Sequence, residues 1–310
     1  MSNNLAPVLL IGFNRPQTLK VVIDVLRNVK PNKVYFAVDG PRKGKKGEDL
    51  LVQQVRDMQK HLDWGCEVKT LFRSKNLGCG EGVKGAISWF FEHEEAGIIV
   101  EDDVVLAPEF FNFASQMLNR YQAEDAIKAV LAFNLHGQKV TSDSYFFYEG
   151  YYPWGWATWK RAWQEYLLYC DKPGNELVFG DDKAYRDVDR SLKLNLNLIN
   201  RGLLDTWDYQ FLYMLRRTKG LSLVPYANLS KNIGVDGAHS HGNVLDFSYG
   251  TMNLSSLDNK FSIEIDKDMN NLYMQEHRKV KYLNGLKLFI LKINAYPILK
   301  KMVRFFRGVL

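Results

Sequence analysis

The chain has 310 residues, of which 46% are hydrophobic and 25% are charged, and its formal net charge is +6. This composition is ordinary for a soluble globular protein with a hydrophobic core, and no internal repeat is visible. Residues 277–310 contain nine Lys and Arg and no Asp or Glu, so subtracting this +9 from the total leaves the first 276 residues at −3. The pattern argues against a nucleic-acid-binding protein, which needs a basic surface on its folded body.

The three cysteines, Cys66, Cys79 and Cys170, have no metal-type spacing, and their odd number argues against a disulfide framework. We therefore expect a reducing compartment. The first residues, MSNNLAPVLLIGF, lack the basic segment of a signal peptide, and no run of 18 apolar residues exists. Neither a cleaved leader nor a membrane-spanning helix is therefore expected.

The first part of the chain alternates short apolar runs with segments whose apolar residues recur at helical spacing. This alternation predicts the α/β class, with a mainly parallel sheet flanked by helices. The predicted strands are 7–13, 33–40, 66–73 and 96–100, and the predicted helices are 15–29, 47–62 and 78–94.

The second half has a different pattern, beginning with twelve aromatic side chains in residues 145–169. The periodicity loosens after about residue 255, so we predict one domain over 1–255 and a C-terminal extension over 256–310. Between the aromatic stretch and that boundary the sequence predicts a helix at about 203–217, a strand within 220–230 and a glycine-rich loop at 232–243.

Three carboxylates, Glu101, Asp102 and Asp103, follow the fourth predicted strand directly. Ligands of such sheets bind at the carboxyl ends of the strands, and Mg²⁺ and Mn²⁺ prefer carboxylate and phosphate oxygens. The triplet therefore predicts a divalent metal site facing a nucleotide diphosphate, and a solvated loop is the alternative. A role in capping is weak, because the next helix is predicted to begin at Pro108.

Three motifs carry a resemblance to a known family: VEDDVVLAPEFFNF (100–113), TWDYQF (206–211) and SHG (240–242). With the α/β first half, they resemble inverting glycosyltransferases of the GT-A fold. The chain is similar to N-acetylglucosaminyltransferase I and to bacterial transferases of surface-polysaccharide synthesis, over roughly residues 6 to 245. The resemblance implies a nucleotide-sugar donor of the UDP type and a divalent cation, Mn²⁺ or Mg²⁺. It also implies a single in-line displacement at the anomeric carbon.

The resemblance also implies roles for individual residues. Asp103 would bind the metal, and Asp102 would support it or contact the ribose or sugar of the donor. Asp208 would be the catalytic base. At the nucleotide, Asp39 would contact the uracil edge and Arg15 would contact the base or the phosphates. The nucleotide pocket would be lined by Arg73, Asn76 and the Gly78–Gly82 segment, which includes Gly82.

Each of these residues also has an ordinary structural explanation. Asp39 precedes Gly40 and Pro41 and could simply form a turn. Arg15 stands at a helix start, where the helix dipole disfavours cations, which hints at a neighbouring anion. The carboxylate of Asp208 suits a base that removes a proton from an acceptor hydroxyl, but an acidic residue in a first helical turn also stabilises the helix.

Aromatic residues and histidines supply further candidates. We expect Trp159 and Trp163 to form a core-facing helix stripe, and Trp154 or Trp156 to line the acceptor site, because sugar faces pack on indole rings. Trp207 lies on the helical face beside the proposed base and is a further candidate to stack on a substrate sugar. His241, in the glycine-rich loop 232–243, is a candidate for the metal or diphosphate, and that loop is a candidate lid that excludes water.

The segment 283–310 combines apolar and cationic residues, with Pro297 dividing it. Such a segment can lie on an anionic bilayer, and packing against a partner or a domain is the alternative. We expect a cytoplasmic enzyme, peripheral on the inner membrane face, with a glycan or lipid-linked acceptor.

Two other functions compete with the glycosyltransferase. A sugar nucleotidyltransferase also places carboxylates and a metal at such a sheet, but its expected glycine-rich phosphate loop is missing from LLIGFNRPQTLK (9–20). A non-enzymatic carbohydrate-binding protein would use the aromatics and would ignore nucleotide and metal.

Overall fold

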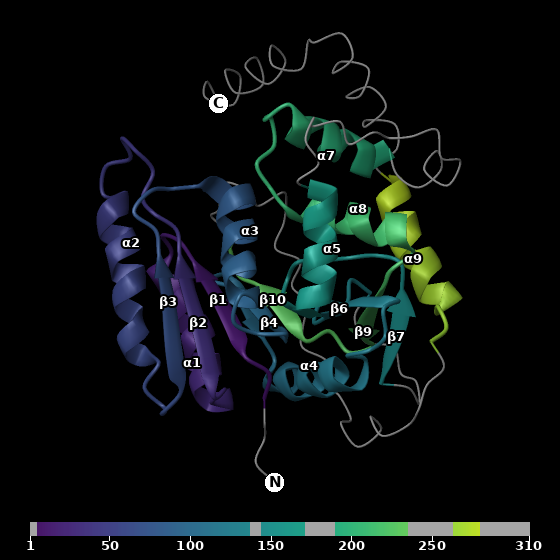
Figure 1. Ribbon diagram of the computed structural model, residues 1–310, viewed down its shortest axis with the longest axis horizontal. Helices are drawn as coiled ribbons and strands as arrows, with labels where there is room; N and C mark the ends of the chain where they lie inside the picture. Colours follow the sequence, from purple (N-terminus) through teal and green to yellow (C-terminus); the bar gives the residue numbers. More distant parts are fainter. Residues whose placement is uncertain (1–4, 137–143, 171–189, 235–262, 280–310) are drawn as a thin grey trace.

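The computed structural model describes residues 5–136, 144–170, 190–234 and 263–279. Its centre is an eight-stranded sheet in the order β3-β2-β1-β4-β8-β6-β9-β7, in which β7 and β8 run opposite to the other strands (Figure 1). The predicted α/β class with a mainly parallel sheet is confirmed. The strands of this sheet are β1 (Val8–Gly12), β2 (Lys33–Val38), β3 (Glu67–Phe72), β4 (Ala96–Glu101), β6 (Ile127–Leu131), β7 (Tyr145–Tyr148), β8 (Trp156–Trp159) and β9 (Leu221–Pro225).

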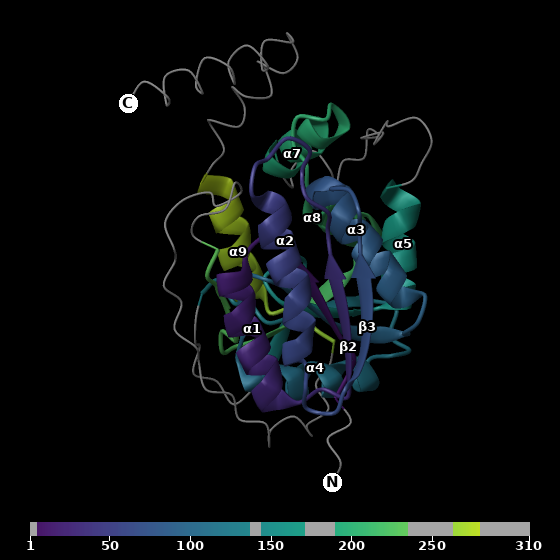
Figure 2. The same cartoon turned by 90° about the vertical axis from the view of Figure 1, so that its left-hand side faces the viewer.

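Helices cover both faces of the sheet. One face packs against α1, α2 and α4, and the other against α3, α5, α7, α8 and α9. Figure 2 shows α1 and α2 on one side of β2 and β3, with α3 and α5 on the other. The helices are α1 (Pro16–Val29), α2 (Glu48–Asp57), the 3₁₀ turn η1 (Met58–His61), α3 (Gly78–Phe91), α4 (Pro108–Arg120), α5 (Lys160–Cys170), α7 (Arg190–Asn200), α8 (Asp208–Thr218) and α9 (Lys267–Lys279).

The local sequence explains why α1 begins and ends where it does. Pro16 occupies the first turn, where its missing N–H costs nothing. The helix ends at Lys30, which adopts the left-handed conformation (φ 54°) and donates its N–H to the carbonyl of Leu26. The residues at helical spacing that face the sheet are all buried: Leu19, Val22, Ile23 and Leu26.

Two predictions for the second half were wrong in detail. Trp159 ends strand β8 and does not share a helix with Trp163, although both side chains are buried. The helix predicted at 203–217 begins only at Asp208, because residues 203–207 form an irregular segment. That segment has a role of its own in the site described below.

Residues beyond 255 contribute to the same core as the sheet. Ile265 forms a bridge with Phe147 of β7, and Tyr273 of α9 packs on Tyr148 with ring centroids 4.4 Å apart. The boundary at 255/256 stays a prediction. Within the described ranges no helix is both long and apolar enough to cross a bilayer. The predicted membrane-associating segment, 283–310, lies entirely outside those ranges.

A small second sheet closes the carboxyl end of β4. Strand β5 (Val104–Leu106) pairs antiparallel with β10 (Ser230–Asn232). Gly155, just before β8, packs directly beneath β5 with φ +79°, and a Cβ there would meet the side chains of Leu106 and Val104. The place of β5, and of the acidic triplet before it, therefore depends on a glycine at 155.

We expect Gly155→Ala to destabilise the protein by two effects, backbone strain of roughly 1–2 kcal/mol and overpacking of roughly 1–3 kcal/mol. Gly202→Ala is the matched control, because Gly202 also has positive φ (+63°) but nothing lies within 4 Å of the added Cβ. The free energy of unfolding in urea measures both. Equal losses in the two variants would contradict the packing argument.

Candidate functional site

The acidic triplet lies at the carboxyl end of β4, beside the loop that follows β1. The pairing of the two strands places Ile11 opposite Glu101. The backbone N–H of Phe13 donates to Asp102 Oδ2 at 2.9 Å. Arg15 forms an ion pair with Asp103 and lies 3.8 Å from Asp102 Oδ1. The anion expected beside Arg15 is therefore this pair of aspartates, and Arg15 is the positive group among the crowded carboxylates.

Asp103 is covered by the chain that leaves β10. Its backbone carbonyl accepts a hydrogen bond from Ile233 N at 2.7 Å. Gly234 packs so closely that a Cβ there would collide with the Asp103 carboxylate. The start of the predicted lid loop therefore lies against the predicted metal ligand, whereas His241 lies outside the described residues.

Burial and mutual repulsion raise the pKa of two carboxyl groups in the triplet. Glu101 is packed by protein, and this burial, with the charges of Asp103, Asp102 and Asp208, raises its pKa to about 8 against the opposing effect of Arg15. Burial and then Asp103 raise the pKa of Asp102 to about 7, although its hydrogen bond and Arg15 act the other way. One guanidinium does not neutralise this many carboxylates.

Four of the predicted nucleotide-site residues lie together. Asp39 accepts hydrogen bonds from Asn76 Nδ2 and from the N–H of Leu77, both at 2.9 Å. Arg73 donates to the carbonyl of Gly82 at 2.8 Å, and burial lowers its pKa. A Cβ on Gly82 would lie 3.2 Å from Asp39 Oδ2. These bonds of Asp39 join the loop after β2 to the segment before α3, without a turn at residues 39–42, in the same place where the resemblance implies a base-reading role.

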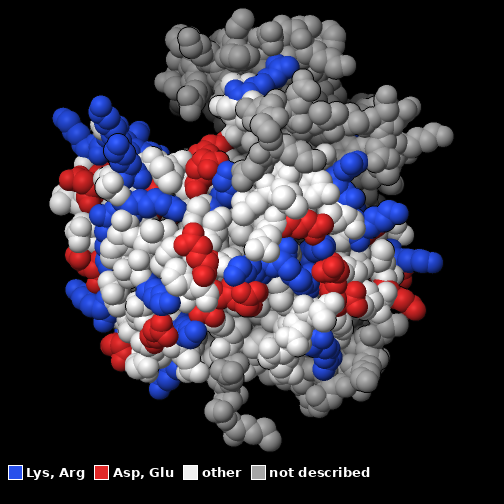
Figure 3. Space-filling model, in the orientation of Figure 1, with Lys and Arg blue, Asp and Glu red and all other residues white. Residues whose placement is uncertain are grey.

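A second polar network joins the loops after β1 and β2. The carboxylate of Glu48 accepts from Arg42 N at 2.7 Å and from Asn14 Nδ2 at 3.0 Å, and it forms an ion pair with the Arg42 guanidinium. These hydrogen bonds with Arg42 lower the pKa of Glu48. The exposed lysines 43, 45 and 46 follow, and cationic side chains gather over the loop leading into α2, at the upper left of Figure 3.

Asp205 has a role that the sequence analysis missed. Its carboxylate accepts the backbone N–H of Cys79 at 2.9 Å and that of Gly80 at 2.8 Å, at the N-terminus of α3. From the sequence, Asp205 is recognisable only as a possible cap of the helix that follows it, and the Gly78–Gly82 segment is expected along the nucleotide pocket. A usable signal was the helix start GCG, which has no side-chain cap of its own.

Asp208 is the first residue of α8, with Trp207 at the N-cap position. The hydroxyl of Thr206 donates a hydrogen bond to Asp208 Oδ1. Asp208 also contributes to the raised pKa of Glu101, so the predicted base and the acidic triplet share one region of the protein. The fold brings them together from strand β4 and helix α8.

The predicted acceptor-site tryptophans differ in exposure. Trp156 is fully buried and stacks on the buried Trp207 with ring centroids 5.5 Å apart. Trp154 is only partly buried and packs on Phe133 at 4.7 Å. Of the three, Trp154 has the surface that a sugar would need. Burial of Trp156 and Trp207 favours a supporting position behind the site.

Two buried donors near these rings have no partner in the part of the chain that the structure describes. Neither the hydroxyl of Tyr151 nor Trp156 Nε1 has a hydrogen-bond partner among the described residues. The charges of Asp208 and Glu101 both reach Tyr151, where they help burial to raise its pKa. A buried water between polar groups would satisfy such donors.

The residues fit a divalent cation that takes a single carboxylate from the protein. No group of three or more His, Cys, Asp and Glu within the described ranges could hold a metal by itself. Asp103 could offer a single carboxylate, which suits Mg²⁺ or Mn²⁺ when substrate oxygens and water supply the other ligands. The excess of buried negative charge around it supports the same assignment.

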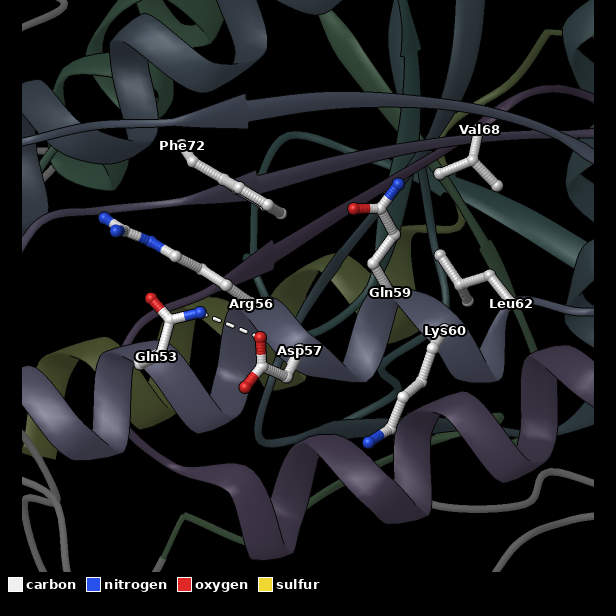
Figure 4. Close-up of a pocket in the computed structure, with 8 residues that line it drawn as sticks. All are labelled: Gln53, Arg56, Asp57, Gln59, Lys60, Leu62, Val68 and Phe72. Carbon is white, nitrogen blue, oxygen red and sulfur yellow. Dashed lines mark hydrogen bonds between the residues drawn. The ribbon is translucent and has the colours of Figure 1, made fainter.

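A hollow of about 780 Å³ lies elsewhere, at the edge of the sheet. Figure 4 shows side chains of α2, η1 and β3 around it, with Gln53 donating to Asp57. None of the residues discussed above lines this hollow, so we do not assign it to the same site. Its lining residues are Gln53, Arg56, Asp57, Gln59, Lys60, Leu62, Val68 and Phe72.

Comparison with known proteins found no family model that matches the chain. The chain is similar to an N-acetylglucosaminyltransferase. This enzyme, the alpha-1,3-mannosyl-glycoprotein 2-beta-N-acetylglucosaminyltransferase of Arabidopsis thaliana, is 27% identical over 141 residues. The match covers 43% of this chain but only 31% of the plant enzyme. It agrees with the resemblance identified from the motifs, and the layers of the fold are those expected of a GT-A protein.

Similar solved structures include transferases of two kinds. The mannosyltransferase PcManGT from Pyrobaculum calidifontis, in complex with GDP-Man and Mn²⁺, is 13% identical with a TM-score of 0.34, covering 54% of this chain and 47% of its own. A UDP-glucose pyrophosphorylase complexed with UDP-glucose is 6% identical with a TM-score of 0.36, covering 71% and 90%. The inositol-1-phosphate CTP transferase of T. maritima is 11% identical with a TM-score of 0.35, covering 74% and 89%.

The raised pKa values predict a stability that falls with pH. The pKa of Glu101 rises from its ordinary 4.5 to about 8 in the folded protein, and that of Asp102 rises from 3.8 to about 7. Between the two pKa values of each group, the folded state therefore holds more protons than the unfolded state. The metal-free protein should therefore lose stability progressively from about pH 4 to pH 8. Each kcal/mol lost lowers the melting temperature by roughly 2–4 °C for a protein of this size.

Melting temperatures measured across this pH range check the prediction. Glu101→Gln and Asp102→Asn remove the titrating groups and should flatten the profile. Asp63→Asn, which alters an exposed carboxylate, is the control. A wild-type profile that rises through the same window would contradict the assignment of these pKa shifts.

Proposed function

We propose that the protein is a metal-dependent inverting glycosyltransferase that moves a sugar from a nucleotide-sugar donor, of the UDP type, to a glycan or lipid-linked acceptor. The observation that carries this proposal is the pairing of Arg15 with Asp102 and Asp103 at the carboxyl end of the sheet, beside Glu101, whose pKa the charge of Asp208 helps to raise. The similarity to a plant N-acetylglucosaminyltransferase over 141 residues supports it.

In this proposal Asp103 is the protein ligand of Mn²⁺ or Mg²⁺. The bound cation would neutralise the diphosphate and stabilise it as a leaving group. Arg15 pairs with Asp103, and in the donor complex its guanidinium would bind phosphate oxygens. Asp102, held by the N–H of Phe13, keeps the loop after β1 in position.

Asp208 acts as the general base. The acceptor oxygen forms a bond to the anomeric carbon while the bond from that carbon to the diphosphate oxygen breaks, and the acceptor proton passes to the Asp208 carboxylate. Attack on the face opposite the leaving group inverts the configuration. The hydrogen bond from the Thr206 hydroxyl orients the carboxylate of Asp208.

The acceptor and location belong to the same proposal. Partly exposed Trp154 offers an aromatic surface for an acceptor sugar. The apolar and cationic sequence of 283–310 supports attachment to the cytoplasmic face of a membrane, where lipid-linked acceptors would be presented. Loop 232–243, with His241, is proposed to cover the donor.

Nucleotide binding tests the proposal first. UDP and a panel of other nucleoside diphosphates would be titrated by calorimetry with and without Mn²⁺. We expect one nucleotide to bind at least ten-fold more tightly with Mn²⁺, and Asp103→Ala to remove that dependence, because the carboxylate that holds the cation is gone.

Asp57→Ala, on the outer surface of α2, should leave nucleotide binding unchanged. No nucleotide binding under any metal condition would refute the transferase and favour a carbohydrate-binding protein. Release of pyrophosphate from a nucleoside triphosphate and a sugar 1-phosphate would instead identify a nucleotidyltransferase.

Asp208→Asn tests the base. We expect the rate of transfer, or of donor hydrolysis where the acceptor is unknown, to fall by about 10²–10⁴-fold while nucleotide affinity stays within two-fold. Asp268→Asn is the matched control, since Asp268 is also an acidic residue in the first turn of a helix. Retained activity in Asp208→Asn would show that another group accepts the proton.

A further inference from the structure

The N-terminus of α3 is built around a carboxylate from a distant part of the chain. The N-cap residue of this helix, Leu77, makes no side-chain cap, and Asp205 supplies the missing acceptors with one oxygen to Cys79 N and the other to Gly80 N. A Cβ on Gly78 or on Gly80 would collide with that carboxylate. Glycine at both positions therefore allows Asp205 to approach.

The contact includes the backbone beside Asp205. A Cβ on Gly80 would also lie 3.2 Å from the carbonyl oxygen of Thr206. The segment that precedes α8 thus lies directly on the first turn of α3. Since α3 packs in the first half of the fold and α8 follows in the second, this contact ties the two halves together at the carboxyl end of the sheet.

Asp208 follows Asp205 by three residues and is held through the same segment. The Thr206 hydroxyl donates to Asp208 Oδ1, and Trp207 between them is 3% exposed and stacked on Trp156. Residues 205–207 are therefore restrained at each position, by the bonds of the Asp205 carboxylate, by the buried indole of Trp207 and by the Thr206 hydroxyl. The position of Asp208 therefore depends on the attachment of Asp205.

We propose that Asp205 is a positioning residue, which fixes the catalytic carboxylate of Asp208 by anchoring residues 205–207 to the N-terminus of α3. The inference rests on the proposed function of Asp208. In this proposal the N–H groups of Cys79 and Gly80 bind Asp205 and not a phosphate of the donor.

The first test separates catalysis from binding. Donor hydrolysis by Asp205→Ala and Asp205→Asn would be followed as release of nucleoside diphosphate from a panel of UDP- and GDP-sugars. We expect kcat to fall at least ten-fold in Asp205→Ala, with KM for the donor and the calorimetric Kd for the nucleotide within two-fold of wild type. Asp205→Asn keeps the shape and one acceptor oxygen and should show a smaller loss.

The control is Asp63→Ala, an exposed carboxylate remote from this contact, which should retain wild-type kcat. An unchanged kcat with a lowered melting temperature would show that Asp205 is only a helix cap and would overturn the proposal. A tighter nucleotide Kd in Asp205→Ala would also overturn it, because Asp205 would then be competing with the donor phosphate.

The second test needs no substrate. Amide hydrogen exchange in Asp205→Ala should lose protection together at Cys79–Gly80 and at Thr206–Asp208, and loss confined to the α3 amides would overturn the coupling. Wild-type protein that binds no nucleotide would refute the proposed function. Failure of the present inference would leave wild-type binding and hydrolysis intact.

Discussion

The guanidinium of Arg15 and the carboxylates at the end of β4 form the contact on which the rest of the site depends. Like charges in a protein interior repel and are poorly solvated, so they persist only beside a compensating charge. The pairing of β1 with β4 places the two loops side by side, and Arg15 follows β1 by three residues. Sheet register therefore delivers the compensating charge to the acidic triplet.

The single positive charge of Arg15 does not fully compensate the negative charge of the carboxylates around it. The pKa of Glu101 and of Asp102 remains raised by burial and by neighbouring carboxylates even with Arg15 present. A region that still favours positive charge is suited to a cation brought in with an anionic substrate. In the proposed reaction, Arg15 is then available for the diphosphate while Asp103 holds the cation.

The second half of the chain supplies the other side of the site, and it is held in place by two kinds of contact. Aromatic rings, among them the stacked Trp156 and Trp207, fill the layer behind α8. Asp205 attaches the segment before α8 to α3 by charge-assisted hydrogen bonds. Apolar packing gives the layer its stability, and the directional bonds of Asp205 fix where the chain enters the helix.

The sequence by itself determined the class of fold and the position of the acidic triplet at the end of a buried strand. Apolar periodicity located every element up to Glu101 within a few residues, because helices and strands bury their faces with different repeats. The crowded carboxylates after a buried strand indicated the candidate site, because charged residues are unusual directly behind a buried strand. The start of α8 was predicted five residues before its actual start at Asp208. Residues 203–207 resemble a helix start in sequence, but Asp205 within them binds the N-terminus of α3.

Tertiary structure alone decided which partners these residues have. Arg15 meets Asp103 and Asp205 meets Gly80 across long separations in sequence, which no local pattern encodes. Burial separated Trp156 and Trp207 from Trp154, although all three had the same chemical reason to bind a sugar. Spacing along the chain specifies which faces are apolar, whereas the packing of those faces against one another specifies which polar groups meet.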